Sequence, residues 1–306
     1  MTCVIEAKQV TKRYGAMLAL DHVDIHVHPG DIYGLIGDNG AGKSTLLKIL
    51  AGQSFATKGE VQLFGKHDEK ELIRLRRRFG CIVEQPGLFP NLTAEQTLNY
   101  YRIQKGVPDP KKTLQMLELT GIMEKRRCKC KKLSLGQKQR LGLAIAMIGE
   151  PSVLILDEPI NGLDPSGIVE MRNLLQQLNE EKNITILISS HILQELAQIA
   201  TRYGFLSRGR LIEEISAKEL KEKCAGCIEI TVSDIGRFSA MFEQSFPGED
   251  FTVLPGNTLR IHTPSMETAA YSRLAAQSQV DILAMNTHLS TLEDYYMTLK
   301  KGEQQP

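Results

Sequence analysis

The sequence predicts an α/β fold with a mixed, mainly parallel sheet, an antiparallel β part, a helical subdomain and a second, smaller α/β domain. Three observations predict it. Short apolar segments alternate with helical periodicity after Pro151, as in a mainly parallel sheet that is covered on both faces. Residues 87–150 show helical periodicity without a strong strand. Residues 222–306 carry 11 acidic and six basic residues, although the whole chain has a net charge of only +1.

The change in charge predicts a domain boundary. We expect a first domain over residues 1–221, which contains the helical subdomain at about 87–150, and an accessory domain over 222–306. A length of 306 residues and a hydrophobic content of 42% suffice for two cores and exclude a disordered or fibrous chain.

The elements follow from periodicity and turn signals. In the first domain, up to Pro151, we expect strands at 3–10, 20–28, 31–36, 61–64 and 80–84, and helices at 44–50, 94–104, 113–119 and 137–148. Beyond Pro151 we expect strand 153–156, helix 168–178, strand 184–189, helix 192–200 and strands near 204–206 and 210–213. The accessory domain shows a β-α-β-β-α-β pattern, with strands at 228–232 and 258–262 and helices near 238–244 and 268–276.

A glycine-rich segment joins the strand at 31–36 to the helix at 44–50. It fits the pattern G-x-x-x-x-G-K-[ST] and comprises Gly37, Asp38, Asn39, Gly40, Ala41, Gly42, Lys43, Ser44 and Thr45. Glycines let backbone N–H groups approach phosphates, and the helix N-terminus adds partial positive charge. Lys43 suits the β- and γ-phosphates, and the Ser44 hydroxyl suits Mg²⁺. The segment therefore predicts a nucleoside triphosphate site.

Two carboxylates follow the apolar strand 153–156. A buried strand that ends in Asp157 and Glu158 indicates a cationic or polar ligand at that end. Asp157 suits Mg²⁺, directly or through water, and Glu158 suits a general base for an attacking water.

With these motifs, nearly all of residues 1–220 resembles the nucleotide-binding subunit of an ABC transporter. The resemblance extends to Leu133-Ser134-Leu135-Gly136-Gln137, which is similar to the family signature LSGGQ except that Leu135 replaces a glycine. It implies adenine stacking by Tyr14, contact of Gln85 with metal and γ-phosphate, and a hydrogen bond from His191 to the γ-phosphate. Ser134, Gly136 and Gln137 are implied to bind the ATP held by a second subunit, and Asn161–Asp164 resembles the loop that crosses the dimer interface.

The resemblance implies further partners. We expect two ATP molecules between two nucleotide-binding subunits, in a homodimer or a heterodimer, with Mg²⁺ at each. We expect docking to separate transmembrane permease subunits, and the segment 86–98 suits a docking groove. The chain resembles most closely the ATPases of bacitracin-type peptide-antibiotic exporters, through Ile82–Gly87, Asn91-Leu92-Thr93, the LSLGQ signature and Leu292–Tyr296. Export of a peptide antibiotic, drug or similar amphipathic substrate is therefore expected.

Location and alternatives follow from what the sequence lacks. No apolar run reaches the roughly 18–20 residues of a membrane helix, and the N-terminus lacks the pattern of a signal peptide. We expect a cytoplasmic protein, held peripherally at the membrane by its permease, with reduced cysteines. The alternative is a soluble ABC ATPase that acts on ribosomes or nucleic acid through the basic segments 125–132 and 74–78, although no nucleic acid is expected. A P-loop kinase would explain neither Ser134–Gln137 nor His191.

Overall fold

The computed structural model describes residues 2–84, 86–224, 226–262, 264–288 and 291–302. The chain forms two compact units, Met1–Ala217 and Lys218–Pro306, which are described separately. The division lies close to residue 221, where the charge distribution predicts a boundary.

A six-stranded sheet forms the centre of the first unit. Its order is β5 (Phe79–Ile82), β6 (Val153–Asp157), β7 (Thr185–Ser190), β3 (Ile32–Ile36), β8 (Arg202–Ser207) and β9 (Arg210–Ser216). All neighbours are parallel except β8 and β9, which form an antiparallel hairpin. Every residue of β3, β6 and β7 is buried, as expected for strands covered on both faces.

A second sheet in this unit is antiparallel, with the order β2 (Met17–Val27), β1 (Ile5–Tyr14) and β4 (Lys58–Leu63). Both strands of the β1–β2 hairpin are longer than the alternation of apolar residues predicts. Gln9 and His22 have positive φ angles, and the register shifts near them. Such bulges break the two-residue period, so the sequence signal ends before the strand does.

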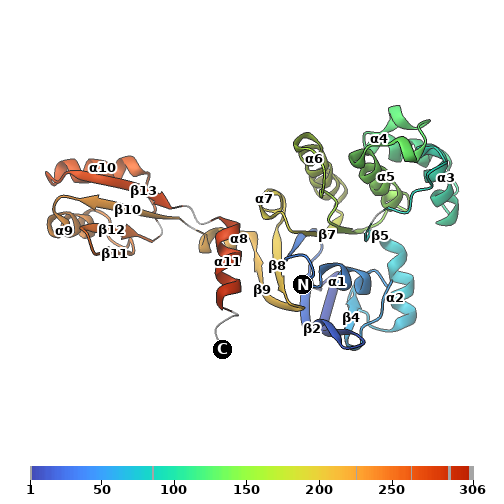
Figure 1. Ribbon diagram of the computed structural model, residues 1–306, viewed down its shortest axis with the longest axis horizontal. Helices are drawn as coiled ribbons and strands as arrows, with labels where there is room; N and C mark the ends of the chain where they lie inside the picture. Colours follow the sequence, from blue (N-terminus) through green and yellow to red (C-terminus); the bar gives the residue numbers. More distant parts are fainter. Residues whose placement is uncertain (1, 85, 225, 263, 289–290, 303–306) are drawn as a thin grey trace. The chain divides into compact units, whose positions relative to one another are not determined.

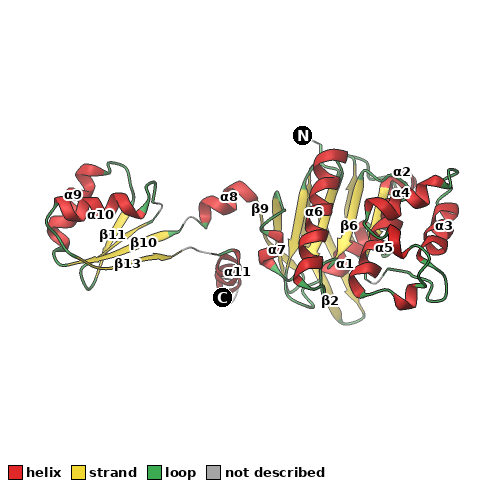
Figure 2. Ribbon diagram, turned by 90° about the horizontal axis from the view of Figure 1, so that it is seen from above, coloured by secondary structure: helices red, strands yellow, loops and turns green. Residues whose placement is uncertain are grey.

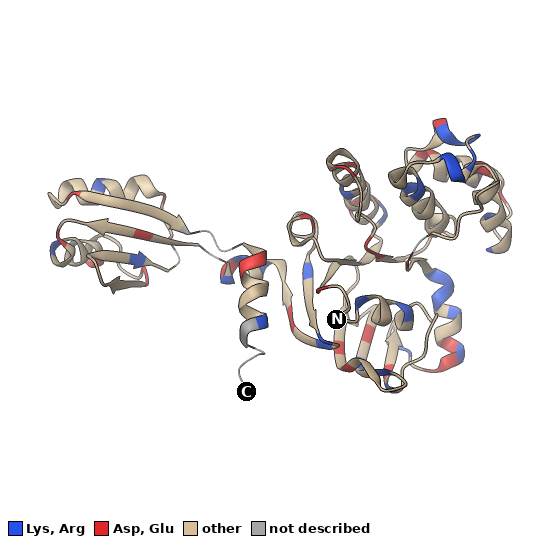
Figure 3. Ribbon diagram, viewed as in Figure 1, with Lys and Arg blue, Asp and Glu red and all other residues tan. Residues whose placement is uncertain are grey.

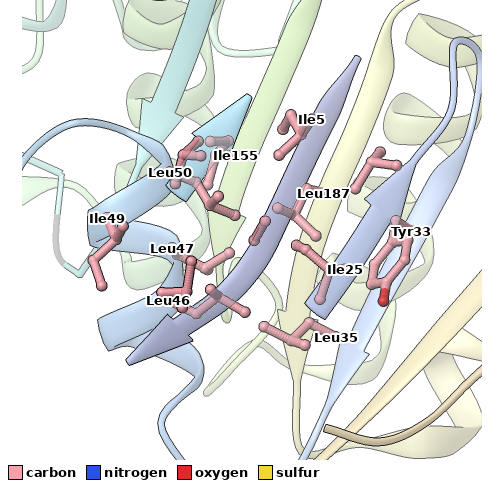
Figure 4. Close-up of a cluster of buried hydrophobic side chains, with 14 of the residues drawn as sticks. Ile5, Ile25, Tyr33, Leu35, Leu46, Leu47, Ile49, Leu50, Ile155 and Leu187 are labelled. Atoms are coloured by element: carbon pink, nitrogen blue, oxygen red, sulfur yellow. The ribbon is translucent and has the colours of Figure 1, made fainter. Parts of the chain in front are cut away.

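The two sheets enclose helix α1 (Lys43–Leu50). Figure 4 shows Leu46, Leu47 and Leu50 of α1 among buried residues of β1, β2, β3, β6 and β7. On the opposite side of the parallel sheet lie α6 (Pro165–Lys182) and α7 (Leu193–Leu196) (Figure 1). Both faces of the parallel sheet are therefore covered, as the sequence predicts, and the antiparallel sheet shares one of these faces with α1. Helix α7 ends well before residue 200, and in the turn that follows Gln198 and Ile199 make i→i−3 hydrogen bonds whereas Ala200 makes an i→i−4 bond.

The expected helical subdomain is present. It contains α3 (Ala94–Gln104), α4 (Lys111–Leu119), α5 (Leu135–Met147) and short 3₁₀ turns at Met123–Lys125 and Cys130–Lys132. Its many lysines and arginines include those of segment 125–132 between α4 and α5 (Figure 3). Before β5, the 3₁₀ turn Arg76–Arg78 follows helix α2 (Glu69–Leu75), which the sequence analysis does not identify. Helix α2 is mostly charged and buries only Leu72, so it lacks an apolar stripe.

The second unit confirms the β-α-β-β-α-β pattern. Its antiparallel sheet has the order β11 (Phe251–Leu254), β12 (Thr258–Ile261), β10 (Cys227–Val232) and β13 (Ile282–His288). Helices α9 (Ile235–Ser245) and α10 (Thr268–Gln277) lie on the same side of it (Figure 2). Helix α8 (Ala217–Lys223) precedes the strands of this sheet in sequence, and helix α11 (Leu292–Gly302) follows them. In the described part of the chain, no helix is long and apolar enough to cross a membrane.

Aromatic rings fill the core between this sheet and its helices. Phe242 is fully buried, and its ring centroid lies 5.1 to 5.8 Å from those of Phe246, Phe251 and Tyr271. The Tyr271 hydroxyl donates to Glu249, and desolvation together with this carboxylate raises the pKa of Tyr271 to about 12. The second unit therefore has a core of its own.

Replacement of Phe242 by alanine tests whether this core is independent. We expect Phe242→Ala to lower the free energy of unfolding of the second unit by about 3–5 kcal/mol, because it leaves a large cavity. Hydrogen exchange should accelerate at Ile228–Val232 but not at Val153–Asp157. Val253→Ala, at a half-exposed position of β11, serves as the control. Equal acceleration in both strands would contradict independent unfolding.

Candidate nucleotide-binding site

The glycine-rich loop runs from the end of β3 to the start of α1, and its close contacts require glycine at two positions. A Cβ on Gly37 would lie 2.5 Å from the carbonyl oxygen of Leu206. Gly42 has a φ of 110°, and a Cβ there would lie 2.7 Å from the carbonyl oxygen of Ala19. Gly42 also precedes α1 without a side-chain cap, so the first N–H groups of the helix are available to a ligand.

Lys43 lies across this loop with only 4% of its surface exposed. Its Nζ donates to the carbonyl oxygens of Gly37 at 2.6 Å and Asp38 at 3.1 Å. The same Nζ lies 3.4 Å from Oε1 of Glu158. The sequence-predicted cation and the sequence-predicted base therefore meet directly.

Asp157 and Glu158 occupy different environments at the end of β6. Asp157 is 8% exposed, and its Oδ1 accepts from the Ser189 hydroxyl at 2.6 Å. Glu158 adopts a left-handed backbone with a φ of 47°, and its N–H donates to Ser189 Oγ at 3.0 Å. The change of backbone conformation turns the second carboxylate away from the buried strand and toward Lys43.

Three side chains surround the carboxylate of Glu158. Besides Lys43, Asn161 donates its Nδ2 to Oε2 at 3.0 Å, and His191 Nδ1 lies 3.1 Å from the same oxygen. Glu158 and His191 follow the neighbouring strands β6 and β7, and Lys43 follows β3, which pairs with β7. Parallel strands bring their carboxyl ends to one edge, so these residues converge from distant parts of the sequence.

A cavity of about 470 Å³ lies beside this cluster. From the predicted set it is lined by Asn39, Gly40, Gly42, Lys43, Ser44, Thr45 and Glu158. Sequence reasoning missed the other lining residues, Met17, Leu18, Ala19, Arg208 and Gly209, which come from the β1–β2 hairpin and the β8–β9 turn. Of these residues only Arg208 has a side chain that could bind phosphate. Apart from Arg208, only the turn residue Gly209 marks this part of the site in the sequence.

Tyr14 lies at the end of β1 and does not line this cavity. Its side chain is 45% exposed, and Lys12 Nζ lies 4.8 Å from the ring centroid. Across the tip of the hairpin it pairs with Met17, which does line the cavity. Tyr14, the residue predicted to contact adenine, is therefore the strand partner of a residue in the wall of the cavity.

The signature segment is separate from this cavity. Ser134 caps α5, where its Oγ accepts from the N–H of Gln137 and the Gln137 side chain accepts from the N–H of Ser134. Neither they nor Gly136 are among the lining residues. Asp164 caps α6 and accepts from Ser166 and Gly167, which lowers its pKa.

Gln85 lies outside the described residues, so its predicted contacts with metal and γ-phosphate remain predictions. Its neighbour Glu84 has a φ of 69° and forms an ion pair with Lys48 of α1. The hydrogen bond to Glu84 raises the pKa of Lys48.

The residues present fit Mg²⁺ and phosphate by their chemistry. The hydroxyl of Ser44 and the carboxylate of Asp157 are the oxygen donors that Mg²⁺ prefers. The uncapped N-terminus of α1 and the buried ammonium of Lys43 suit a polyphosphate.

Comparisons with known proteins agree with this geometry. A family model described as "ABC transporter" matches residues 20–161. The bacitracin transport ATP-binding protein BcrA of Bacillus licheniformis is 38% identical, over 99% of both chains. Its counterpart in Enterococcus faecalis is 40% identical, over 99% of this chain and 98% of that protein. The lantibiotic transport ATP-binding protein SrtF of Streptococcus pyogenes is 39% identical, over 69% of this chain and 90% of that protein.

Solved structures show the same relationship. A dimeric, post-hydrolysis structure of the ATP-binding cassette MJ0796 with ADP and Pi has a TM-score of 0.64 and 28% identity. It covers 70% of this chain and 98% of that one. CbiO1 of Clostridium perfringens, part of the transporter complex cbiONQ, has a TM-score of 0.66 and 28% identity, over 73% and 92% of the two chains. With a phosphate loop, two strand-end acids and full-length relatives of this kind, the chain belongs to the ATP-binding proteins of the ABC transporter family.

Proposed function

We propose that this chain hydrolyses ATP to power export of a peptide antibiotic, drug or similar amphipathic substrate through a separate membrane permease. One observation carries the ATPase: the carboxylate of Glu158 lies against Lys43 of the phosphate loop and His191, beside one cavity. The substrate class rests on the bacitracin transport relatives, which align over 99% of this chain. Because these relatives are named as transport proteins, action on ribosomes or nucleic acid is not favoured.

The reaction follows from the roles of these groups. The N–H groups at the start of α1 and the ammonium of Lys43 bind the phosphates of ATP. Ser44 and Asp157 would hold Mg²⁺, which would supply positive charge to the phosphates of ATP. Glu158 accepts a proton from the attacking water as general base. His191 and Asn161 hold its carboxylate in place, since both lie within 3.1 Å of Oε2.

A second nucleotide-binding subunit completes each site in this proposal. Ser134, Gly136 and Gln137 do not line the cavity of their own chain. They begin a 13-residue helix, and a helix N-terminus favours phosphate. We expect each such segment to bind the ATP held by the partner, as in a homodimer. The dimeric structures of the MJ0796 cassette support this arrangement.

The permease docks on a separate groove of about 390 Å³, lined by residues 86–90 and 130–139. Its walls combine apolar and basic side chains, namely Pro86, Leu88, Pro90, Cys130, Lys131, Leu135, Lys138 and Gln139. The Oε1 atom of Gln139 is buried without a hydrogen-bond partner in the described part of the chain. A segment that supplies a donor to this oxygen would satisfy it. Docking there would hold the chain at the cytoplasmic face of the membrane.

Glu158→Gln tests the general base. We expect ATP binding to persist and turnover to fall by roughly 10²–10⁴-fold, because the amide accepts no proton from water. Steady-state phosphate release measures turnover, and equilibrium titration measures binding. Glu180→Gln, at an exposed position of α6, is the matched control and should behave like the natural protein. Unchanged turnover in Glu158→Gln would refute the assignment.

Lys43→Ala tests the phosphate loop. Loss of a buried ammonium that contacts phosphate should weaken nucleotide binding by about 10–100-fold, the value of one or two charge-assisted hydrogen bonds. A fluorescent nucleotide titration measures the dissociation constant, with the exposed Lys58→Ala as control. Undiminished affinity would contradict the role of Lys43.

Ser134→Ala tests the contribution of the signature segment, and the chain offers a matched control. Thr93 caps α3 through the same reciprocal arrangement with Gln96 that joins Ser134 and Gln137. Each alanine should cost about 1 kcal/mol in helix stability. Only Ser134→Ala should also lower the ATPase rate, by roughly tenfold or more through loss of a phosphate contact. Equal rates in the two variants would count against binding of ATP by Ser134.

A further inference from the structure

Segment 125–132, between α4 and α5, is a strongly basic surface that ATP binding does not explain. Six of its eight residues are lysine or arginine, in a chain whose net charge is only +1. Figure 3 shows these residues close together on the helical subdomain. They lie outside the cavity beside the phosphate loop.

Five of the six basic side chains are exposed and lack an acidic partner within ion-pair distance in the described ranges. These five are Lys125, Arg127, Lys129, Lys131 and Lys132. The sixth, Arg126, lies 3.9 Å from Glu95, and the exposed Glu124 is the neighbouring acid in sequence. So many like charges repel one another, and an anionic partner would relieve that repulsion.

The segment is fixed in place by backbone hydrogen bonds to residues 90–95. The N–H groups of Ala94 and Glu95 donate to Cys128 and Arg126, and those of Cys130 and Lys131 donate to Leu92 and Pro90, all within 2.9 to 3.1 Å. Inside, the Cys130 thiol contacts the Thr97 hydroxyl at 3.2 Å. These bonds therefore hold the backbone that carries the basic side chains in a defined conformation. Lys131 also lines the docking groove.

We propose that segment 125–132 binds the anionic lipid headgroups of the membrane that contains the permease. The proposal rests on the proposed function, because the groove that continues into this surface is the permease site. Each lysine or arginine near an anionic membrane strengthens binding about fivefold, so several act together. The segment contains no aromatic residue for stacking on nucleic acid bases, which favours lipid over RNA as the partner.

In the second basic segment, 74–78, some of the basic side chains contact other parts of the protein. Arg76 donates to the carbonyl oxygen of Leu50 at 3.2 Å, and Arg78 lies 4.1 Å above the ring of Phe64. Two of its four guanidinium groups, those of Arg76 and Arg78, therefore make contacts within the first unit. The exposed cations of this region offer a control with equal charge.

The experiment measures co-sedimentation of the full-length protein with lipid vesicles. The natural protein should bind phosphatidylglycerol vesicles, not phosphatidylcholine vesicles, and binding should weaken with added salt. A triple variant, Lys125→Gln, Arg127→Gln and Lys129→Gln, should bind roughly 10²-fold more weakly. The control variant, Lys70→Gln, Arg74→Gln and Arg77→Gln, has the same net charge and should bind normally. Lys125→Arg with Lys129→Arg should retain binding.

Three results would overturn the proposal. They are no binding of the natural protein to phosphatidylglycerol, equal loss in both triple variants, and tighter binding of a single-stranded RNA that the 125–129 variant abolishes. Failure of the proposed function would look different. It would appear as unchanged turnover in Glu158→Gln, whether or not that variant sediments with anionic vesicles. If both proposals hold, the 125–129 variant keeps its ATPase rate in solution, and Glu158→Gln loses turnover while it still sediments with anionic vesicles.

Discussion

The nucleotide site depends on the two hydrogen bonds that the N–H of Glu158 donates to Ser189. This N–H lies 3.0 Å from the hydroxyl and 3.2 Å from the carbonyl oxygen of that residue. The left-handed backbone at Glu158 costs on the order of 1–3 kcal/mol, and these bonds offset the cost. Ser189 also donates to Asp157, so one serine orients both acids. Without this anchor the second carboxylate would not face Lys43.

The rest of the first unit keeps that arrangement rigid. Strand β7 lies between β6 and β3, and the register pairs Asp157 with Ser189 and Ile36 with Ser190. The ends of all three strands therefore lie at one edge, where the turn after β6 and the phosphate loop face each other. Helix α1 is held between the two sheets by Leu46, Leu47 and Leu50 (Figure 4), so its N-terminus has a fixed direction. Buried apolar packing thus sets the geometry of a polar site.

Sequence reasoning identifies the polar half of this site and misses the apolar half. Lys43 and Glu158 belong to motifs with a chemical reason for each residue type, and the parallel sheet brings the ends of their strands to one edge. Met17 and Leu18 line the same cavity and lie in the β1–β2 hairpin. Its bulges break the alternation of apolar residues, so the sequence underestimates how far its strands extend. Apolar residues in a bulged strand carry no signal of a ligand. Helix α2 was missed for a related reason, since a charged helix with one buried residue shows no periodicity.

The departure at Leu135 has a structural explanation. The family signature has glycine there, and a large side chain would be expected to obstruct the helix N-terminus. Instead the Leu135 side chain lies toward the loop that follows Glu158, where a Cβ on Gly162 would be 2.9 Å from its Cδ2. Gly162 has a φ of 73°, so glycine suits both its backbone and this contact. Its neighbour Asn161 holds the carboxylate of Glu158, and the signature segment therefore packs against the loop that positions the base.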